Sequence, residues 1–548
     1  MPLWLVWLAA LGSVLAFLGS YGILDNNEGL YAEIPREMLA GHDWRLWVIP
    51  HLNGLPYMEK PPLLYWLTAG SFSLFGIHEW SARLVPALSS LACMTMLLRF
   101  GKAIGKEQVG RLAALMFVSG VGVAQMSRTL MFDMLLTVFL TGALMAAYLY
   151  SVERKPALLR IAYAALALAL MAKGMAALLL FGLVMGFFLL PALFKDGIGA
   201  TCRTWLQPVA LSIFVVIAAP WHIAASMVEP IFPWFYFINE HVLRFLGKRE
   251  PHDYYSGPWW YYLPRMLLYL FPWSFLLLGL LQRRLDADTN ESRKLSRFLL
   301  LAWLLPLLFF SVSSAKANYY LVVVMPFAAF QLALALERRE FLSARWRLAP
   351  GMLLALLTGT GAAYLAVRGA RLAAEPLILG MPPVQFAIGT LAGLCLLSLC
   401  VALVAWKWNR VGVASYVVVS AWCVGSLLVA INAVEPDVST RPLAQFLQKE
   451  MPGRQVYLYR NFEELSSLPY YFGAPLRVID SRSNDLYWGN KLQANDLLID
   501  EAQFGTAIAS GPVAVVVMEK QLKDFRASSW FIAFKGQKQI GNNTVFYN

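Results

Sequence analysis

Charged residues are scarce in this chain, and their scarcity excludes an ordinary soluble domain. Only 14% of its 548 residues are Asp, Glu, Lys or Arg, and 59% are hydrophobic. Soluble globular proteins average about 25% charged and roughly 45–50% apolar residues. The composition therefore indicates a protein of the lipid bilayer. The net charge of +12 does not indicate nucleic-acid binding, because the Lys and Arg residues gather in short loops between apolar runs.

Cysteines and nucleotide-binding motifs are also lacking. The chain has five cysteines, four inside apolar runs and one in a basic loop, so no disulfide framework is expected. We find no Walker-type phosphate loop, no dinucleotide fingerprint in a strand-helix context, and no zinc protease motif. An internal repeat, which is common in secondary transporters, is absent as well. These absences disfavour nucleotide-driven chemistry and transport.

Long apolar runs are what the chain does have. A helix needs about 20 apolar residues to cross hydrocarbon, and runs near that length predict about thirteen spans. The first lacks a charged start and a small-residue cleavage site, so we interpret it as a retained span rather than a signal peptide. The predicted spans are 3–22, 81–99, 111–127, 130–150, 157–172, 174–194, 207–226, 262–281, 297–314, 319–337, 348–368, 384–406 and 413–433.

The basic loops predict the orientation. Every second connection carries Lys and Arg, which places those connections in the cytoplasm together with the N-terminus. Two long outer loops remain, residues 23–80 and 227–261. After a transmembrane region of residues 1–433, residues 434–548 change to short β-rich runs alternating with helix-compatible stretches. We expect them to form a small α/β domain on the outer side.

The first outer loop holds two acidic stretches. Asp25 and Glu28 directly follow the first span, where a membrane substrate would meet water; alternatively, they cap a helix on the membrane surface. Farther on, Tyr57 precedes Glu59 and Lys60, which two prolines hold in an extended conformation. A rigid Glu-Lys pair suits a site that needs a fixed cation beside a phosphate, or it anchors the loop among headgroups. Residues 33–37 have the spacing of a solvated helix face with local ion pairs.

Ionisable residues at the outer ends of other spans are further candidates, because charges at membrane depth are costly unless they pair or line a cavity. These are Asp133, Lys173 before Gly174, and Lys316 with Tyr319 and Tyr320. Snorkelling or a structural ion pair is the alternative for each. In the second loop, Glu240, His241 and Arg244 share one helical turn, beside Trp and Tyr residues typical of an interfacial belt. Glu59 and His241 suggest a divalent metal such as zinc, although two ligands are weak evidence.

These motifs resemble the aminoarabinose lipid A transferases, members of the C-type membrane glycosyltransferase superfamily and relatives of the protein O-mannosyltransferases. The resemblance covers most of the chain, and two of its strings are fairly specific, residues 57–63 and residues 257–264. The other matching stretches are residues 31–33 and 36–38, Lys173-Gly174, residues 239–244, and Lys316 with Tyr319-Tyr320.

The resemblance implies a fold and a reaction. The fold would have thirteen helices, periplasmic juxtamembrane helices and a periplasmic α/β domain in a monomer of the bacterial inner membrane. The donor would be undecaprenyl phosphate aminoarabinose, the acceptor a lipid A phosphate, and the consequence resistance to polymyxin and other cationic peptides. No cofactor would be required. A relative that uses galacturonic acid or a hexose, and a protein mannosyltransferase, remain alternatives; a secondary transporter is a remote one.

In this reading the lipid A phosphate attacks C1 of the sugar while undecaprenyl phosphate leaves. Fixed cations and phenols, namely Lys60, Arg244, Lys316 and Tyr320, would stabilise the leaving phosphate. Asp25, Glu59, Lys60 and Asp133 are the predicted catalytic residues. Because a phosphate acceptor is already anionic, Asp25 would orient the acceptor or hold the donor's ammonium rather than act as a general base. The predicted substrate-binding residues are Tyr57, Lys173, Glu240, His241, Arg244, Lys316, Tyr319 and Tyr320.

Overall fold

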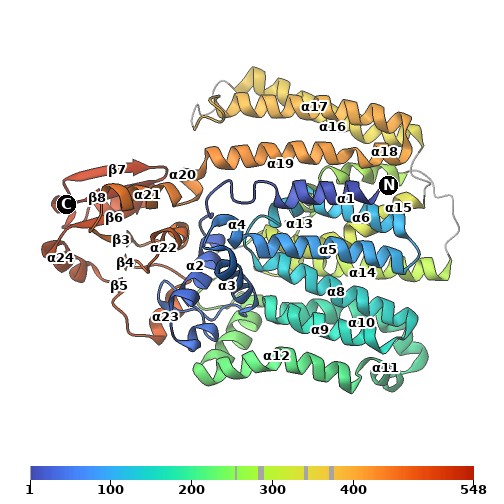
Figure 1. Ribbon diagram of the computed structural model, residues 1–548, viewed down its shortest axis with the longest axis horizontal. Helices are drawn as coiled ribbons and strands as arrows, with labels where there is room; N and C mark the ends of the chain where they lie inside the picture. Colours follow the sequence, from blue (N-terminus) through green and yellow to red (C-terminus); the bar gives the residue numbers. More distant parts are fainter. Residues whose placement is uncertain (1, 253–255, 282–288, 339–342, 370–375) are drawn as a thin grey trace.

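A bundle of long helices carries a layer of strands and short helices at one end (Figure 1). The structure is a computed structural model that describes residues 2–252, 256–281, 289–338, 343–369 and 376–548. Parts of the predicted basic loops at 283–297 and 338–347 lie outside the described residues. The N-terminus lies at the side of the bundle and the C-terminus at the far edge of the strand layer.

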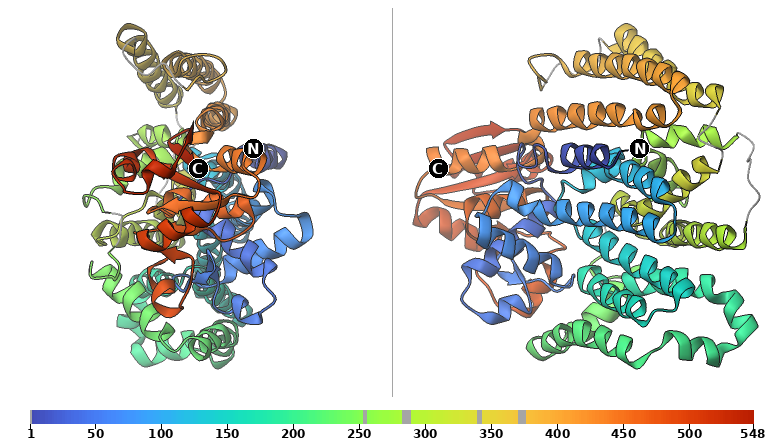
Figure 2. Two further views of the ribbon diagram at one scale, coloured as in Figure 1. Left: turned by 90° about the vertical axis from the view of Figure 1, so that its left-hand side faces the viewer. Right: turned by 45° about the vertical axis from the view of Figure 1, so that its right-hand side comes forward.

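Within the described residues, ten helical segments are long and apolar enough to cross a membrane. The prediction of a polytopic helical membrane protein is therefore confirmed at this level. The segments are α5 (Leu84–Ala103), α8 (Phe132–Glu153), α9 (Pro156–Lys173), α10 (Ala176–Asp196), α12 (Pro208–Val228), α14 (Asn290–Val312), Asn318–Glu337, α16 (Ala344–Arg368), α17 (Pro383–Lys407) and Val411–Ala433. Helices α16 and α17 pair as a hairpin that stands at the edge of the bundle (Figure 2).

Three predicted spans are not among these ten segments. The first is α1 (Leu3–Ala10) followed by a π-helix, η1 (Leu11–Leu15), which ends at Ala16, where the backbone is extended. The run at 111–127 is split into α6 (Glu107–Ser119) and α7 (Val121–Met126) by Gly120, whose backbone is extended. The run at 262–281 is α13 (Tyr262–Tyr269) and a 3-10 helix, η4 (Trp273–Leu281), on either side of Pro272, which cannot donate a helix hydrogen bond. The count of thirteen spans therefore stays a prediction.

The first outer loop is ordered throughout. It contains α2 (Asn27–Ala40), η2 (Trp44–Trp47), a short hairpin of β1 (His51–Leu52) and β2 (Leu55–Pro56), α3 (Leu63–Phe75) and α4 (Glu79–Ala82). The expectation of a solvated face at residues 33–37 is wrong, because α2 packs between α3 and α22 (Ser467–Phe472). Glu33, Arg36 and Glu37 are all less than 9% exposed. Arg36 does pair with Glu33 at 2.6 Å, so the local ion pair is confirmed.

The second outer loop follows α12 and continues as a π-helix, η3 (Trp234–Leu243). Beyond α13 and η4 come α14, a 3-10 segment η5 (Asn318–Val324) and α15 (Met325–Glu337). Because α13 contacts both η5 and α7, the ends of several helices converge at one end of the bundle. This convergence forms the wall that the strand layer faces.

After α19 (Tyr416–Ala433), the chain forms α20 (Glu435–Val438), α21 (Arg441–Glu450) and a six-stranded mixed sheet. The β-rich runs predicted from the sequence are confirmed as strands β3, β4 and β6. The strand order is β5-β4-β3-β6-β8-β7, the first four parallel and the last two antiparallel. The strands are β3 (Gln455–Tyr459), β4 (Arg477–Ile479), β5 (Leu498–Ile499), β6 (Val513–Met518), β7 (Gly536–Ile540) and β8 (Asn543–Tyr547).

Both faces of this sheet are buried, as expected where parallel strands dominate. Val513, Val515 and Val517 pack against Phe504 of α24 (Glu501–Ser510) and Phe525 of α25 (Leu522–Arg526). On the opposite face, Ala514 and Val516 join the large core that also contains α21 and residues of the first outer loop. The sheet is therefore continuous with the helical part of the molecule.

Backbone hydrogen bonds tie the segment after η1 to the C-terminal layer. Four N–H groups of residues 22–26 donate across more than 400 positions of sequence. Gly29 of α2 allows close approach here, because a Cβ would lie 2.4 Å from Ser466 Oγ. The bonds run from Gly22 to Glu435 Oε1 (3.3 Å), from Ile23 to Tyr471 Oη (2.7 Å), from Asp25 to Val438 O (2.8 Å) and from Asn26 to Glu463 O (2.9 Å).

Candidate active site

A cavity of about 1360 Å³ lies where the two outer loops, the outer helix ends and the C-terminal layer meet. One part of its wall is charged and aromatic. The rest is apolar and comes from the start of α10, from η3 and from the end of α14. The apolar lining includes Leu178, Leu179, Phe237, Val242, Phe245, Leu246, Phe309 and Phe310.

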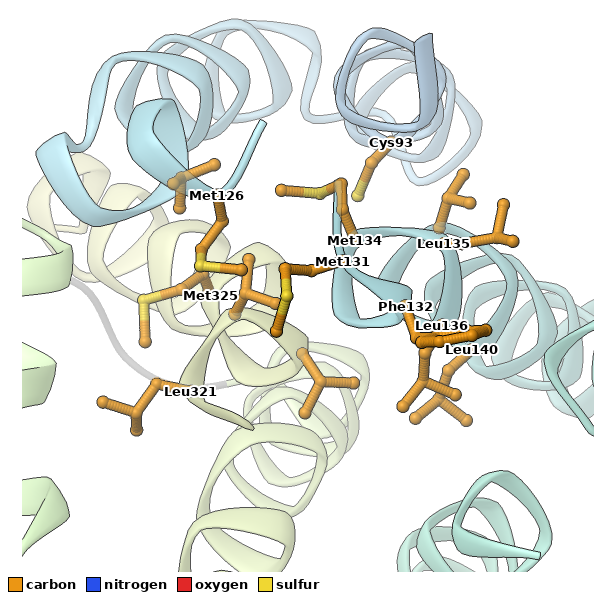
Figure 3. Close-up of a cluster of buried hydrophobic side chains, with 14 of the residues drawn as sticks. Cys93, Met126, Met131, Phe132, Met134, Leu135, Leu136, Leu140, Leu321 and Met325 are labelled. Atoms are coloured by element: carbon orange, nitrogen blue, oxygen red, sulfur yellow. The ribbon is translucent and has the colours of Figure 1, made fainter. Parts of the chain in front are cut away.

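The start of α8 forms another stretch of wall. Met131, Phe132 and Leu136 line the cavity and also belong to a buried cluster with Met126 and Met325 (Figure 3). Tyr31 packs edge-on against Phe132, with ring centroids 4.7 Å apart. Tyr57, a predicted binding residue, also lines the cavity and is 3% exposed. This wall is therefore supported by a tightly packed core.

The charged part of the wall centres on Lys60. Its Nζ lies 3.4 Å from Glu59 Oε2 and 3.7 Å from Glu240 Oε2. Arg249 bridges the same two carboxylates, at 2.5 Å from Glu59 Oε1 and in an ion pair with Glu240, while Arg244 Nη1 lies 3.1 Å from Glu240 Oε2. The five side chains carry three positive and two negative charges. The wall beside Lys60 therefore favours an anion.

Electrostatics keep the Glu59 carboxylate of this cluster ionised. Burial alone would raise the pKa of Glu59, but Arg249 and Lys60 together lower that pKa to about 2. Glu59 consequently carries its charge at any physiological pH and holds the two cations in place. A buried charge network is stable only when each member is paired, and this one is paired throughout.

Asp133 and Lys173 form a second ion pair at the cavity. Asp133 lies in the first turn of α8 and Lys173 ends α9, positions at which the helix dipoles stabilise these charges. Lys173 Nζ lies 4.6 Å from the Tyr320 ring centroid and 5.3 Å from that of Tyr319. Gly174 has a φ of +82°, and a Cβ there would lie 2.7 Å from Tyr236 Oη. Only glycine suits this turn.

His241 lies in the cavity wall, but its ring nitrogens already have partners. Nδ1 lies 2.6 Å from the carbonyl oxygen of Tyr236, and Nε2 accepts from the Met175 N–H at 3.1 Å. Both Glu59 oxygens are likewise taken by Arg249 and Lys60. The arrangement does not fit the suggested metal pair, and the part of the chain that the structure describes holds no group of three or more such ligands.

Two predicted site residues are not among those that line the cavity. Asp25 Oδ1 accepts from the N–H and the Oγ of Ser467, at 3.0 and 2.7 Å, so Asp25 joins the first loop to the C-terminal layer. Burial raises the pKa of Asp25 to about 8. Lys316 donates to the carbonyl oxygens of Ser311 and Ser313, at 2.8 and 2.7 Å, and so caps the end of α14. Neither arrangement supports the roles predicted for these two residues.

Glu28 belongs to a structural network. Its carboxylate pairs with Arg83 through two hydrogen bonds of 2.9 Å and also accepts from the N–H groups of Leu24 and Leu130. Glu28 and Arg83 are 2% and 0% exposed. The structure therefore gives Glu28 a structural role, as the buried partner of Arg83 rather than as the cap of a surface helix.

The structure also places residues at the cavity that sequence reasoning missed. Arg249 is the central cation, and a signal existed: basic residues are depleted in outer loops, yet this one has Arg244, Lys248 and Arg249. The C-terminal layer contributes a polar rim for which we find no signal in the sequence. Its members are Asn461, Glu463, Glu464, Arg482, Asn484, Asp485 and Lys520.

Comparison with known proteins extends this description. A family model described as dolichyl-phosphate-mannose-protein mannosyltransferase matches residues 59–223. An undecaprenyl phosphate-alpha-4-amino-4-deoxy-L-arabinose arabinosyl transferase of Sodalis glossinidius is 34% identical over 57% of this chain and 54% of its own length. A relative of the same name from Aeromonas salmonicida is 33% identical over 57% and 56%. The chain thus spans just over half the length of these relatives.

Solved structures share the fold. The crystal structure of ArnT from Cupriavidus metallidurans bound to undecaprenyl phosphate has a TM-score of 0.81, covers 99% of this chain and 97% of its own, and is 22% identical. An oligosaccharyltransferase of Archaeoglobus fulgidus has a TM-score of 0.53 at 12% identity, covering 98% of this chain and 73% of its own. The resemblance to aminoarabinose transferases inferred from the sequence is confirmed.

Proposed function

We propose that this chain is a glycosyltransferase that moves 4-amino-4-deoxy-L-arabinose from undecaprenyl phosphate to a phosphate of lipid A. The observation that carries the proposal is one cavity in which the cations around Lys60 lie next to an apolar wall. A lipid-linked sugar phosphate has the same two parts, an anionic head and a hydrocarbon chain. The names of the relatives support this choice of donor and sugar.

The two parts of the donor fit the two parts of the wall. The polyprenyl chain would lie along the apolar side chains of α10, η3 and α14, which would bury it away from water. The donor phosphate would face Lys60 and Arg244, whose charges it complements. Lys173, fixed by Asp133 and by the rings of Tyr319 and Tyr320, would supply a further cation at the same end of the cavity.

The reaction follows from this placement. An oxygen of the acceptor phosphate forms a bond to C1 of the sugar, and the bond from C1 to the oxygen of undecaprenyl phosphate breaks. The leaving phosphate keeps the electron pair, and the fixed cations stabilise the negative charge that develops there. A phosphate acceptor has no proton to lose at neutral pH, so the step needs no general base. Asp25 is hydrogen-bonded to Ser467 and is not among the residues that line the cavity, so the proposed step gives it no part in proton transfer.

The remaining residues would position these groups. Glu59 and Glu240 hold the cations, Tyr57 shapes the cavity beside them, and His241 ties η3 to the turn at Gly174. We propose that the protein acts as a monomer, with this cavity on the periplasmic side of the inner membrane. The cellular outcome would be resistance to polymyxin and other cationic peptides.

The proposed activity is tested with purified protein in detergent, lipid-linked aminoarabinose and lipid A, followed by mass spectrometry of the lipid. A mass increment equal to one aminoarabinose residue on a phosphate is the expected result. A parallel reaction contains polyprenyl phosphate mannose and a Ser/Thr peptide. Glycosylation of the peptide, without modification of lipid A, would reject the proposal in favour of a protein mannosyltransferase.

The orientation is tested separately by thiol labelling of intact spheroplasts with an impermeant reagent. Starting from a cysteine-free variant, we expect cysteines introduced at Gly54 and Asp500 to react. The native Cys202, retained alone, is exposed but lies in a loop predicted to be cytoplasmic, so it should react only after lysis. Labelling of Cys202 in intact spheroplasts would reverse the proposed orientation.

A further inference from the structure

The charges that line the cavity are almost completely paired. Six acidic side chains contribute to its wall, and five have partners of opposite charge or hydrogen-bond donors. The paired ones are Glu59 with Arg249, Glu240 with Arg249, Asp133 with Lys173, Glu464 with Lys520, and Glu463 with Ser483 Oγ. The sixth is Asp485, whose carboxylate has no hydrogen bond or ion pair within the described residues.

Asp485 is held in a rigid segment. Its own N–H donates to Glu463 Oε1 at 3.2 Å, and the next residue, Leu486, is 1% exposed. On one side, Asn484 Nδ2 donates to the carbonyl oxygen of His252 at 2.9 Å. On the other, Tyr487 Oη donates to Glu250 Oε1 at 2.6 Å. The segment is therefore bound to the second outer loop on both sides of Asp485, which fixes the backbone that carries the carboxylate.

The surroundings of Asp485 would be stabilised by a cation next to its carboxylate. Burial, and then the charges of Glu59 and Glu463, raise the pKa of Asp485 well above its usual range, while Arg249 and Lys60 oppose the shift. Asp485 thus lies within electrostatic reach of the Lys60 cluster without being paired to it. A ligand that brings a positive charge to this carboxylate would offset both the cost of its desolvation and its repulsion by Glu59 and Glu463.

The proposed donor brings such a charge. Its sugar has an ammonium on C4, and C4 lies opposite C1 across the six-membered ring. With the phosphate on C1 at the Lys60 cluster, the ammonium would extend away from those cations. The phosphates and acylated sugars of the acceptor offer no cation. Glu463 and Glu464 are already engaged by other side chains, which leaves Asp485 as the receptor.

We infer that Asp485 binds the C4 ammonium of the donor sugar, so that the C-terminal layer selects an aminosugar while the first outer loop holds the donor phosphate. The inference rests on the proposed function and assigns the sugar specificity to one side chain. It also gives the C-terminal layer a direct role in substrate recognition.

The test compares two lipid-linked donors that differ only at C4, one with the free amine and one with the amine acylated and therefore neutral. Asp485→Asn has nearly the same shape without the charge. We expect it to lower kcat/KM for the amine donor about 10- to 100-fold, mainly through KM, since a hydrogen bond to a charged group is lost. With the acylated donor, the variant should match the wild type within about 2-fold.

The matched control is Asp496→Asn, which removes an exposed carboxylate from the same layer and should change neither donor's kinetics. Asp485→Ala serves as a second variant if the Asn protein folds poorly, and the same selective loss is expected. Equal losses with both donors, or no loss with the amine donor, would overturn the inference alone. Failure of the wild type to transfer aminoarabinose would instead overturn the proposed function, and the inference with it.

Discussion

The two acidic stretches of the first outer loop look alike in sequence but have different surroundings. Asp25 is hydrogen-bonded to Ser467, Glu28 is buried against Arg83, and neither lines the cavity. Glu59 instead lines the cavity and holds Lys60 at its wall. An acidic residue at the outer end of a span therefore either stabilises the fold or belongs to the site, and the segment that packs over it decides which.

The element that decides between these outcomes comes from the far end of the sequence. Ser467 belongs to α22 in the C-terminal layer, and it covers the first acidic stretch. Beside the second stretch, the C-terminal layer packs Trp488 near Met58 and contributes polar residues to the cavity lining. The following substitutions test whether the first stretch serves stability and the second serves transfer.

The largest loss of stability is expected for Glu28→Gln. The change leaves Arg83, which is 0% exposed, without its carboxylate. An uncompensated buried charge costs about 3–5 kcal/mol. Thermal unfolding in detergent should show a strongly lowered midpoint, and the small folded fraction should keep its catalytic rate. If the variant kept its stability but lost transfer, Glu28 would act in catalysis, and the two acidic stretches would not differ in role.

Lys60→Ala should have the opposite profile. Removing one preorganised electrostatic contact to a developing charge costs about 10²–10³ in rate. The unfolding midpoint should change little, because Arg249 still pairs with both Glu59 and Glu240. The assay is the initial rate with lipid-linked aminoarabinose. Lys106→Ala is the control, since Lys106 pairs with Glu337 away from the cavity. Wild-type transfer by a folded Lys60→Ala protein would contradict the proposed mechanism.

Asp25→Asn should change the pH dependence of stability rather than transfer. The pKa of Asp25 is about 8 in the folded protein against about 4 in the unfolded chain. The folded state therefore binds the proton more tightly, and its stability is highest below pH about 4 and falls as pH rises to about 8. The amide of the Asn variant cannot ionise, so the variant should lack the part of the pH dependence of stability that comes from Asp25.

The measurement is the unfolding midpoint of both proteins from pH 5 to pH 9. As pH rises, the unfolding midpoint of the variant should increase relative to that of the wild type, because the variant has no carboxyl group that must ionise in its enclosed site. The rate of transfer per folded molecule should stay unchanged. A large fall in the rate of transfer without a change in stability would show that Asp25 takes part in transfer after all.

The smallest effect is expected for Glu107→Gln, which breaks an exposed i,i+4 pair with Arg111 at the start of α6. Such pairs are worth about 0.3–0.5 kcal/mol. The unfolding midpoint and the rate should both stay close to those of the wild type. This variant sets the background against which the Glu28 and Lys60 variants are compared.

Much of the site could be predicted from the sequence, because charged residues are costly at membrane depth and therefore few. Lys60, Asp133, Lys173, Arg244 and Tyr320 all come together at the cavity. Position along a span does not reveal which way a side chain turns, however. Lys316 has the same local signal but donates to the carbonyl oxygens that end α14.

The missed residues share a different cause. Asp485 follows no apolar run and belongs to no motif, and only the packing of α23 (Tyr487–Leu492) against the second outer loop brings it to the cavity. In the fold, long apolar runs and alternating β-rich runs were predictable. The break at Gly120 was not, because it depends on the close approach of Tyr269 from a distant segment: a Cβ on Gly120 would lie 2.8 Å from its carbonyl oxygen.

The hydrogen bonds from residues 22–26 to the C-terminal layer bear on the order in which the protein is made. Gly22 and its partner Glu435 are 413 residues apart. At a synthesis rate of about 5–20 residues per second, the ribosome needs about 20–80 s to add the partner. During that interval the first outer loop exists without the strands and helices that will cover it. The cavity is therefore completed only when the C-terminal layer, which contributes residues from Asn461 to Lys520 to its lining, has been made and has folded. A ribosome that stalls before this layer leaves an intermediate in which the cavity lacks that part of its wall.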